Sequence, residues 1–157
     1  MGPLVFTPYF RPQIWGGRRL ESKLHKALPP EGKFGESWEI SVQPHHVSEV
    51  AEGEHAGRTL VDLWNECRAE LVGDFSGTQF PLLVKLLDCQ ELLSVQVHPD
   101  DALAQEILGQ PNGKTEAWIV LHAEPAGVIY AGFKPGTDPD VLRRALADGT
   151  VADHLHS

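Results

Sequence analysis

The sequence has few cysteines, and this scarcity excludes two classes of protein. Its 157 residues contain only two, Cys67 and Cys89. They lie far apart and lack zinc-finger spacing, so we expect neither a disulfide framework nor a cysteine-based zinc module. The pattern favours two buried, reduced thiols in a cytoplasmic protein.

Positive charge is also scarce. The chain has 13 Lys and Arg against 22 Asp and Glu, a formal net charge of −9, and no run of basic residues. Nucleic acid and anionic membrane surfaces are therefore not expected partners. An anionic small molecule stays compatible with this charge, because a few local cations can outweigh it inside a cleft.

Long hydrophobic runs are absent. The most apolar stretch, residues 80–93, is interrupted by Pro81, Lys85 and Asp88 and is too short to span a bilayer. The first residues show no basic segment followed by an apolar one, so the sequence predicts no signal peptide and no membrane partner.

What the sequence does contain is typical of a globular domain made of short elements. Hydrophobic residues make up 41% and charged residues 22%, and 12 prolines and 15 glycines are scattered along the chain. The length suggests one domain, and residues 3–20 look irregular. Alternating or continuous apolar patterns predict strands at residues 36–43, 47–51, 80–88, 92–98, 114–121 and 127–133.

Three segments have helical signals. Apolar residues at helical spacing predict a helix over 59–72, with Thr59 as N-cap. A shorter helix, capped by Asp100 or Asp101, ends at Leu108, and a turn follows at residues 111–113. Another helix begins at Asp138–Pro139. Strands with a few peripheral helices indicate a mainly β fold, a β-sandwich or jelly roll.

The segment 94–98 holds the first candidate functional residues. Because side chains alternate along a strand, Ser94, Gln96 and His98 share one face. Val95 and Val97 then point toward a core. An amide and an imidazole on one face are possible metal ligands.

The segment 114–121 adds a cation and a carboxylate. Lys114, Glu116 and Trp118 share one face of the predicted strand. If both strands lie in one sheet, His98 and Glu116 can converge on a metal.

Structural explanations stay open for each of these residues. His98 can be a core or loop histidine, Lys114 and Glu116 can form a surface ion pair, and Ser94 can be an exposed polar residue.

Four motifs in order carry a family resemblance. The chain resembles type I mannose-6-phosphate isomerase of the short bacterial branch, a zinc enzyme with cupin jelly-roll domains. The matching segments are 35–41 (GESWEIS), 80–85 (FPLLVK), 93–101 (LSVQVHPDD) and 113–118 (GKTEAW).

The resemblance implies a role for each candidate residue. Gln96, His98 and Glu116 fall on zinc-ligand positions, Lys114 on a lysine with a role in substrate handling or proton transfer, and Ser94 near the phosphate. The implied reaction interconverts mannose 6-phosphate and fructose 6-phosphate, phosphorylated hexoses, through a cis-enediol.

The resemblance also implies residues that this sequence does not contain. A further histidine ligand, in a segment reading Pro-Ala-Gly-x-x-His, and an arginine are expected beyond residue 157. Residues 1–157 are then expected to be the N-terminal cupin-like domain of such an enzyme. Two hypotheses follow: a zinc-dependent isomerase, or a truncated noncatalytic cupin module with a partial metal or sugar-phosphate site. An iron cupin oxygenase is less compatible, because such sites use two nearby histidines and segment 94–98 offers only His98.

Overall fold

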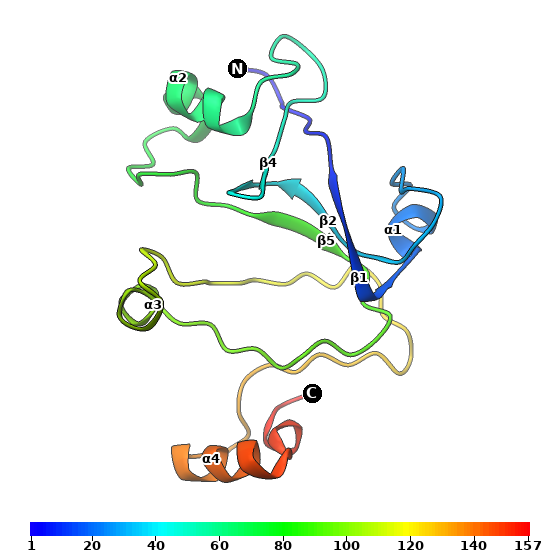
Figure 1. The fold of residues 1–157 in the computed structure, drawn as a ribbon, viewed down its shortest axis with the longest axis vertical. Coiled ribbons are helices and arrows are strands. Elements are labelled where there is room, and N and C mark those ends of the chain that lie inside the picture. The colour runs from blue at the N-terminus through cyan, green and yellow to red at the C-terminus, as the bar shows by residue number, and fades with distance from the viewer. The chain divides into compact units, whose positions relative to one another are not determined.

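Three antiparallel strands form the centre of the first of two units. The computed structural model describes all residues, 1–157, and divides them into unit 1 (Met1–Leu93) and unit 2 (Ser94–Ser157). In unit 1 the strand order is β1 (Tyr9–Gly17), β2 (Phe34–Ile40) and β5 (Val84–Leu87), side by side in blue, cyan and green in Figure 1. The strand predicted over residues 80–88 is thus present in its second half.

Strand β1 was not predicted, because its sequence resembles a loop. The expectation of irregular structure over residues 3–20 is wrong: β1 pairs with β2, and a short helix, α1 (Arg19–Ser22), follows it. The ladder has register shifts on both sides of Pro12. An edge strand tolerates a proline at such irregularities, since one side of its backbone needs no partner.

Strands β1 and β2 come unusually close at Gly16. A side-chain Cβ at this position would overlap the backbone of Phe34 and Gly35. Only glycine therefore allows this contact between the two backbones.

The strand predicted over residues 36–43 is broken at Ser41. The Ser41 hydroxyl donates to the carbonyl of His46 and accepts from the Gln43 amide. This bonding ends β2 and opens a small hairpin of β3 (Val42–Gln43) and β4 (His46–Val47). The remainder of the strand predicted over 47–51 forms only isolated bridges.

Helix α2 (Leu60–Val72) confirms the helix predicted over residues 59–72. Thr59 caps it, accepting from the amide of Asp62, whose carboxylate bonds back to the Thr59 amide. The first turns bury Leu60, Leu63 and Trp64.

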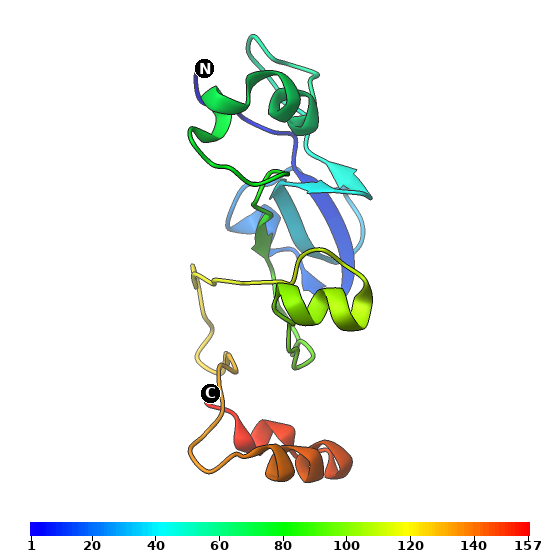
Figure 2. The same cartoon turned by 90° about the vertical axis from the view of Figure 1, so that its left-hand side faces the viewer.

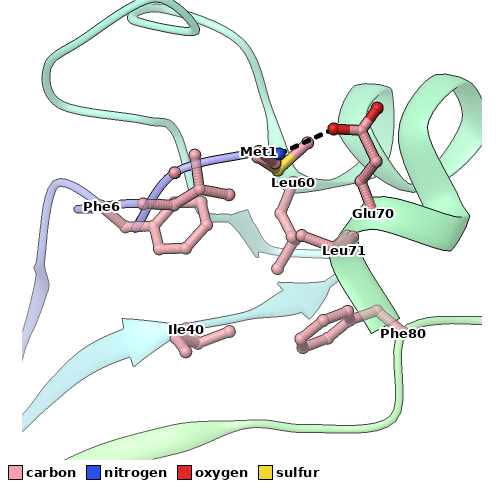
Figure 3. Close-up of a pocket in the computed structure, with 9 residues that line it drawn as sticks. Met1, Phe6, Ile40, Leu60, Glu70, Leu71 and Phe80 are labelled. Atoms are coloured by element: carbon pink, nitrogen blue, oxygen red, sulfur yellow. Dashed lines mark hydrogen bonds and ion pairs between the residues drawn. The ribbon is translucent and has the colours of Figure 1, made fainter. Parts of the chain in front are cut away.

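A hollow of about 280 Å³ lies beside α2 in unit 1 (Figure 3). Apolar side chains line most of it, and the Met1 ammonium donates to Glu70 at 2.8 Å. The apolar lining residues include Phe6, Ile40, Leu60, Leu71 and Phe80.

Unit 2 contains two α-helices with the expected caps. Helix α3 (Asp101–Leu108) is capped by Asp100, and α4 (Pro139–Asp148) by Asp138. A 3-10 turn, η1 (Val151–His154), packs against α4 (Figure 2). No helix of the chain has both the length and the apolar character needed to cross a membrane.

The strands predicted over 92–98, 114–121 and 127–133 do not form ladders. Only an isolated bridge between Phe133 and Leu155 involves these segments. Val97, which was expected to point toward a core, is 82% exposed, and Ile119 in the segment 114–121 is 87% exposed. A strand needs a neighbour that satisfies its backbone N–H and C=O groups, and no strand of the chain pairs with these segments.

Candidate metal centre

Two backbone contacts in unit 2 bring segment 113–116 beside His98. The Asp101 carboxylate accepts from the Gly113 amide at 2.8 Å, and the Lys114 amide donates to the Pro99 carbonyl at 3.1 Å. A Cβ on Gly113 would overlap the backbone of Pro99 and Asp100, so the approach requires glycine. The functional side chains are therefore positioned by the start of α3.

Three candidate side chains meet at this point. The Lys114 Nζ lies 2.6 Å from Glu116 Oε1 and 3.1 Å from His98 Nε2. His98 Nε2 lies 3.2 Å from Glu116 Oε2. The convergence of His98 with Glu116, expected from two alternating segments, is present although neither segment is a paired strand.

The Nε2 atom of His98 faces both of the other groups. Because it lies 3.1 Å from the Lys114 ammonium and 3.2 Å from Glu116 Oε2, it accepts from the lysine in one tautomer and donates to the carboxylate in the other. In either tautomer an imidazole nitrogen and a carboxylate oxygen lie side by side.

Lysine also controls the charge of the carboxylate. The hydrogen bond from Lys114 lowers the pKa of Glu116 below its ordinary value, and the charge of Lys114 acts in the same direction, opposed by partial burial. Contributions from His98 and Trp118 also lower it. Glu116 is therefore ionised at neutral pH and suited to hold a cation.

Gln96 and Ser94 form a separate pair. The Gln96 amide nitrogen donates to Ser94 Oγ at 3.1 Å, as expected for residues on one face. Gln96 makes no hydrogen bond with His98 or Glu116. Its amide oxygen and the Ser94 hydroxyl proton stay available to a ligand.

The donors present fit zinc in type and spacing. Neutral imidazole and carboxylate are common zinc ligands, and two such atoms on one tetrahedral zinc are separated by about 3.3 Å. The distance between His98 Nε2 and Glu116 Oε2 is close to this value. No group of three or more His, Cys, Asp and Glu side chains comes together in the chain.

The positioning role of Asp101 and Gly113 was not predicted from the sequence. Both Asp100 and Asp101 were predicted as possible caps of this helix. In the structure Asp100 caps α3, whereas the Asp101 carboxylate accepts from the amide of Gly113. The turn signal at residues 111–113 was the available clue.

An ionic group on the sheet of unit 1 was also missed. Trp38 is only 2% exposed and lies between Arg11 and Lys85, each about 5 Å from a ring centroid of its indole. Its Nε1 donates to Glu36 at 2.6 Å, and Arg11 donates to the same carboxylate. The signal was the spacing of two between Glu36 and Trp38, which places both on one face of β2.

Known proteins similar to the chain are phosphomannose isomerases. The family model "Phosphomannose isomerase type I, catalytic domain" matches residues 4–124. A putative mannose-6-phosphate isomerase of Bacillus subtilis is 44% identical over 129 residues, 82% of this chain and 40% of that protein. A mannose-6-phosphate isomerase of Streptococcus mutans is 41% identical over 153 residues, 98% of this chain and 47% of that protein.

A solved structure agrees with these matches. The crystal structure of the mannose 6-phosphate isomerase from Bacillus subtilis matches with a TM-score of 0.88 and 36% identity, covering 99% of this chain and 49% of that one. The match confirms the predicted fold class, a mainly β cupin fold with few helices. The chain spans less than half the length of these relatives.

Proposed function

The chain belongs to the type I phosphomannose isomerase family, and from this premise we propose that it carries part of a zinc-dependent site interconverting mannose 6-phosphate and fructose 6-phosphate. In this proposal residues 1–157 are the N-terminal cupin-like domain of the enzyme. The observation that carries it is the meeting of His98, Lys114 and Glu116 within 3.2 Å.

The proposed zinc ligands in this chain are His98, Glu116 and the amide oxygen of Gln96. When bound, zinc supplies Lewis-acid stabilisation of negative charge on the sugar oxygens. The further histidine and the arginine implied by the resemblance have no matching motif in residues 1–157, so the proposal includes their supply by additional polypeptide.

Lys114 is the proposed proton-handling residue. Isomerisation through a cis-enediol moves a proton between C2 and C1 of the sugar, which a positioned acid–base group promotes. A lysine amine can take a proton only in its neutral form, and a neighbouring metal cation disfavours the ammonium form. Lys114, beside two proposed ligands, is placed for this effect.

Ser94 is the proposed phosphate contact. Its oxygen already accepts a hydrogen bond from Gln96, which leaves its own proton free to donate to a phosphate oxygen. The link between Ser94 and Gln96 would couple the phosphate contact to a metal ligand. The expected partner is thus a phosphorylated hexose, and the cytoplasmic location stays a prediction.

A coupled isomerase assay on the 157-residue chain with added zinc tests the proposal. We expect turnover of mannose 6-phosphate once a polypeptide that carries the missing histidine and arginine is added, and loss of this turnover in Glu116→Gln. Glu124→Gln is the matched control, because Glu124 also lies 3.2 Å from a histidine, His122, and neither residue is a proposed ligand. Absence of turnover in a folded, zinc-loaded sample that also contains this additional polypeptide would contradict the proposal.

A noncatalytic cupin module is the second candidate. It is favoured by the small number of zinc-binding side chains that meet here: one histidine, His98, and one carboxylate, Glu116. Zinc stoichiometry and titration with mannose 6-phosphate separate the candidates. Binding of either without turnover supports the module, whereas activity that disappears in Glu116→Gln supports the enzyme.

A further inference from the structure

A second hollow of unit 1, of about 240 Å³, lies beside the first turns of α2. Its apolar lining comes from α2 and from the segment that follows this helix, and includes Val61, Trp64 and Phe80. The volume is below the range of pockets that hold drug-sized molecules, so the hollow suits a ligand as small as one monosaccharide.

Arg68 holds the two walls of this hollow together. Its guanidinium lies 4.5 Å from the ring centroid of Trp64 on α2. The same group donates to the carbonyls of Phe75 and Gly77, in the segment that follows the helix. Phe80 also contacts Trp64 edge to face, with ring centroids 6.1 Å apart. The walls are thus fixed to each other before a ligand binds, which lowers the entropic cost of binding.

No charged side chain lines this hollow, although 22% of the residues in the chain are charged. The nearby Arg68 is occupied by Trp64 and by two backbone carbonyls. A charged ligand would lose its hydration here without gaining an ionic partner, which is unfavourable. The lining therefore favours an uncharged ligand over a phosphorylated one.

Three polar side chains of the hollow are available to a ligand. Asn65, Thr78 and Gln79 are exposed residues of the lining, and none makes a side-chain hydrogen bond within the chain. Amide and hydroxyl groups both donate and accept hydrogen bonds. The hydroxyl groups of a sugar do the same, while the C–H groups of its ring can pack against the apolar lining.

We propose that this hollow binds an unphosphorylated monosaccharide. Asn65, Thr78 and Gln79 bond its hydroxyl groups, and Val61 and Phe80 contact its ring. The inference is independent of the proposed function, because no residue of the candidate metal centre lines the hollow. For a sugar bound without an ionic contact we expect a dissociation constant on the order of 1 mM.

Titration of the 157-residue chain with mannose, followed by the NMR signals of its backbone amides, is the test. We expect saturable shifts in residues 61–65 and 78–80. Thr78→Val removes the hydroxyl at nearly constant volume, and Asn65→Ala removes an amide at an exposed helical position that alanine favours. Each variant should weaken binding by about three- to tenfold, the effect of one hydrogen bond.

The matched control is Gln105→Ala, which removes an exposed amide from α3 and should leave the mannose affinity unchanged. Mannose 6-phosphate should not shift residues 61–65 and 78–80. Absence of saturable shifts in the unchanged chain overturns the inference, as does equal affinity in Asn65→Ala, Thr78→Val and the unchanged chain. Shifts confined to residues 94–118 would place the sugar at the candidate metal centre and also overturn it. None of these outcomes decides whether His98 and Glu116 bind zinc.

Discussion

At the scale of single residues, His46 has a buried nitrogen without a partner. Its ring stacks on Tyr9, with centroids 4.2 Å apart and planes 13° apart, and its Nε2 makes no hydrogen bond. Burial lowers the pKa of His46, and the neighbouring His45 lowers it further. The folded chain therefore favours the neutral ring.

Unfolding should become easier in acid because of His46. The neutral His46 ring contributes its full share to folding stability at pH values above the pKa of this histidine in the unfolded chain, about 6.5. It is lost as the pH falls through the lower pKa of the folded chain, because the unfolded chain binds the proton more readily. His46→Phe keeps the stacked ring and should flatten the dependence of the urea midpoint on pH, followed by tryptophan fluorescence.

The control for this prediction keeps His46 and changes its stacking partner. Tyr9→Phe retains an aromatic ring against His46 and should leave the pH dependence as it is in the unchanged chain. An equal slope in His46→Phe and the unchanged chain would show that the buried nitrogen does not titrate differently on unfolding.

Side-chain contacts were predictable from the sequence where they are local. The alternation along segments 94–98 and 114–118 placed Ser94 beside Gln96 and Lys114 beside Glu116, and both pairs are in contact. The bond from Lys114 to His98 was not predictable. It depends on the path of the chain around α3, which no local pattern specifies.

At the scale of elements, helices were predicted better than strands for a physical reason. Helices α3 and α4 contain their own hydrogen-bond partners and their own caps, Asp100 and Asp138. A strand's partners come from elsewhere in the chain. The apolar alternation of residues 92–98 and 114–121 was therefore real, but it did not show whether a neighbouring strand was available.

The start of α3 should control metal affinity through Asp101. Asp101→Ala removes the bond to the Gly113 amide, so segment 113–116 should move away from His98. We expect zinc affinity to fall by about tenfold or more, as when support of metal ligands is lost. Asp101→Asn keeps an acceptor and should restore most of the affinity.

Asp100→Ala is the comparison for this prediction. It removes the cap of α3 at about 1 kcal/mol of stability but not the bond to Gly113. Zinc affinity that falls equally in Asp100→Ala and Asp101→Ala would show that helix stability, rather than the Gly113 contact, positions the site.

At the scale of the whole molecule, the two units satisfy their backbones differently. In unit 1, β2 is hydrogen-bonded on both sides, to β1 and to β5. In unit 2, long stretches between the helices have no ladder. The resemblance predicted the fold class of the whole chain correctly. It did not predict that unit 1 has paired strands whereas the segments between the helices of unit 2 have none.

Hydrogen exchange should reveal the difference. Amides of β2 should exchange slowly, whereas those of residues 116–123 should exchange nearly as fast as in an unstructured peptide, with the helical amides of α3 in between. Mass spectrometry of the unchanged chain gives these rates by segment. Slow exchange throughout residues 116–123 that persists on dilution would contradict the unpaired backbone.

The contact at Gly16 limits how this sequence can vary. Any side chain there would push β1 away from Phe34 and Gly35 and so disturb the edge of the three-stranded sheet. An alanine at position 16 is a small chemical change, yet it would be tolerated only after a compensating shift elsewhere in the backbone. Divergence at this position therefore requires coupled changes, and a relative with a larger residue at this position should pair its first two strands in another register.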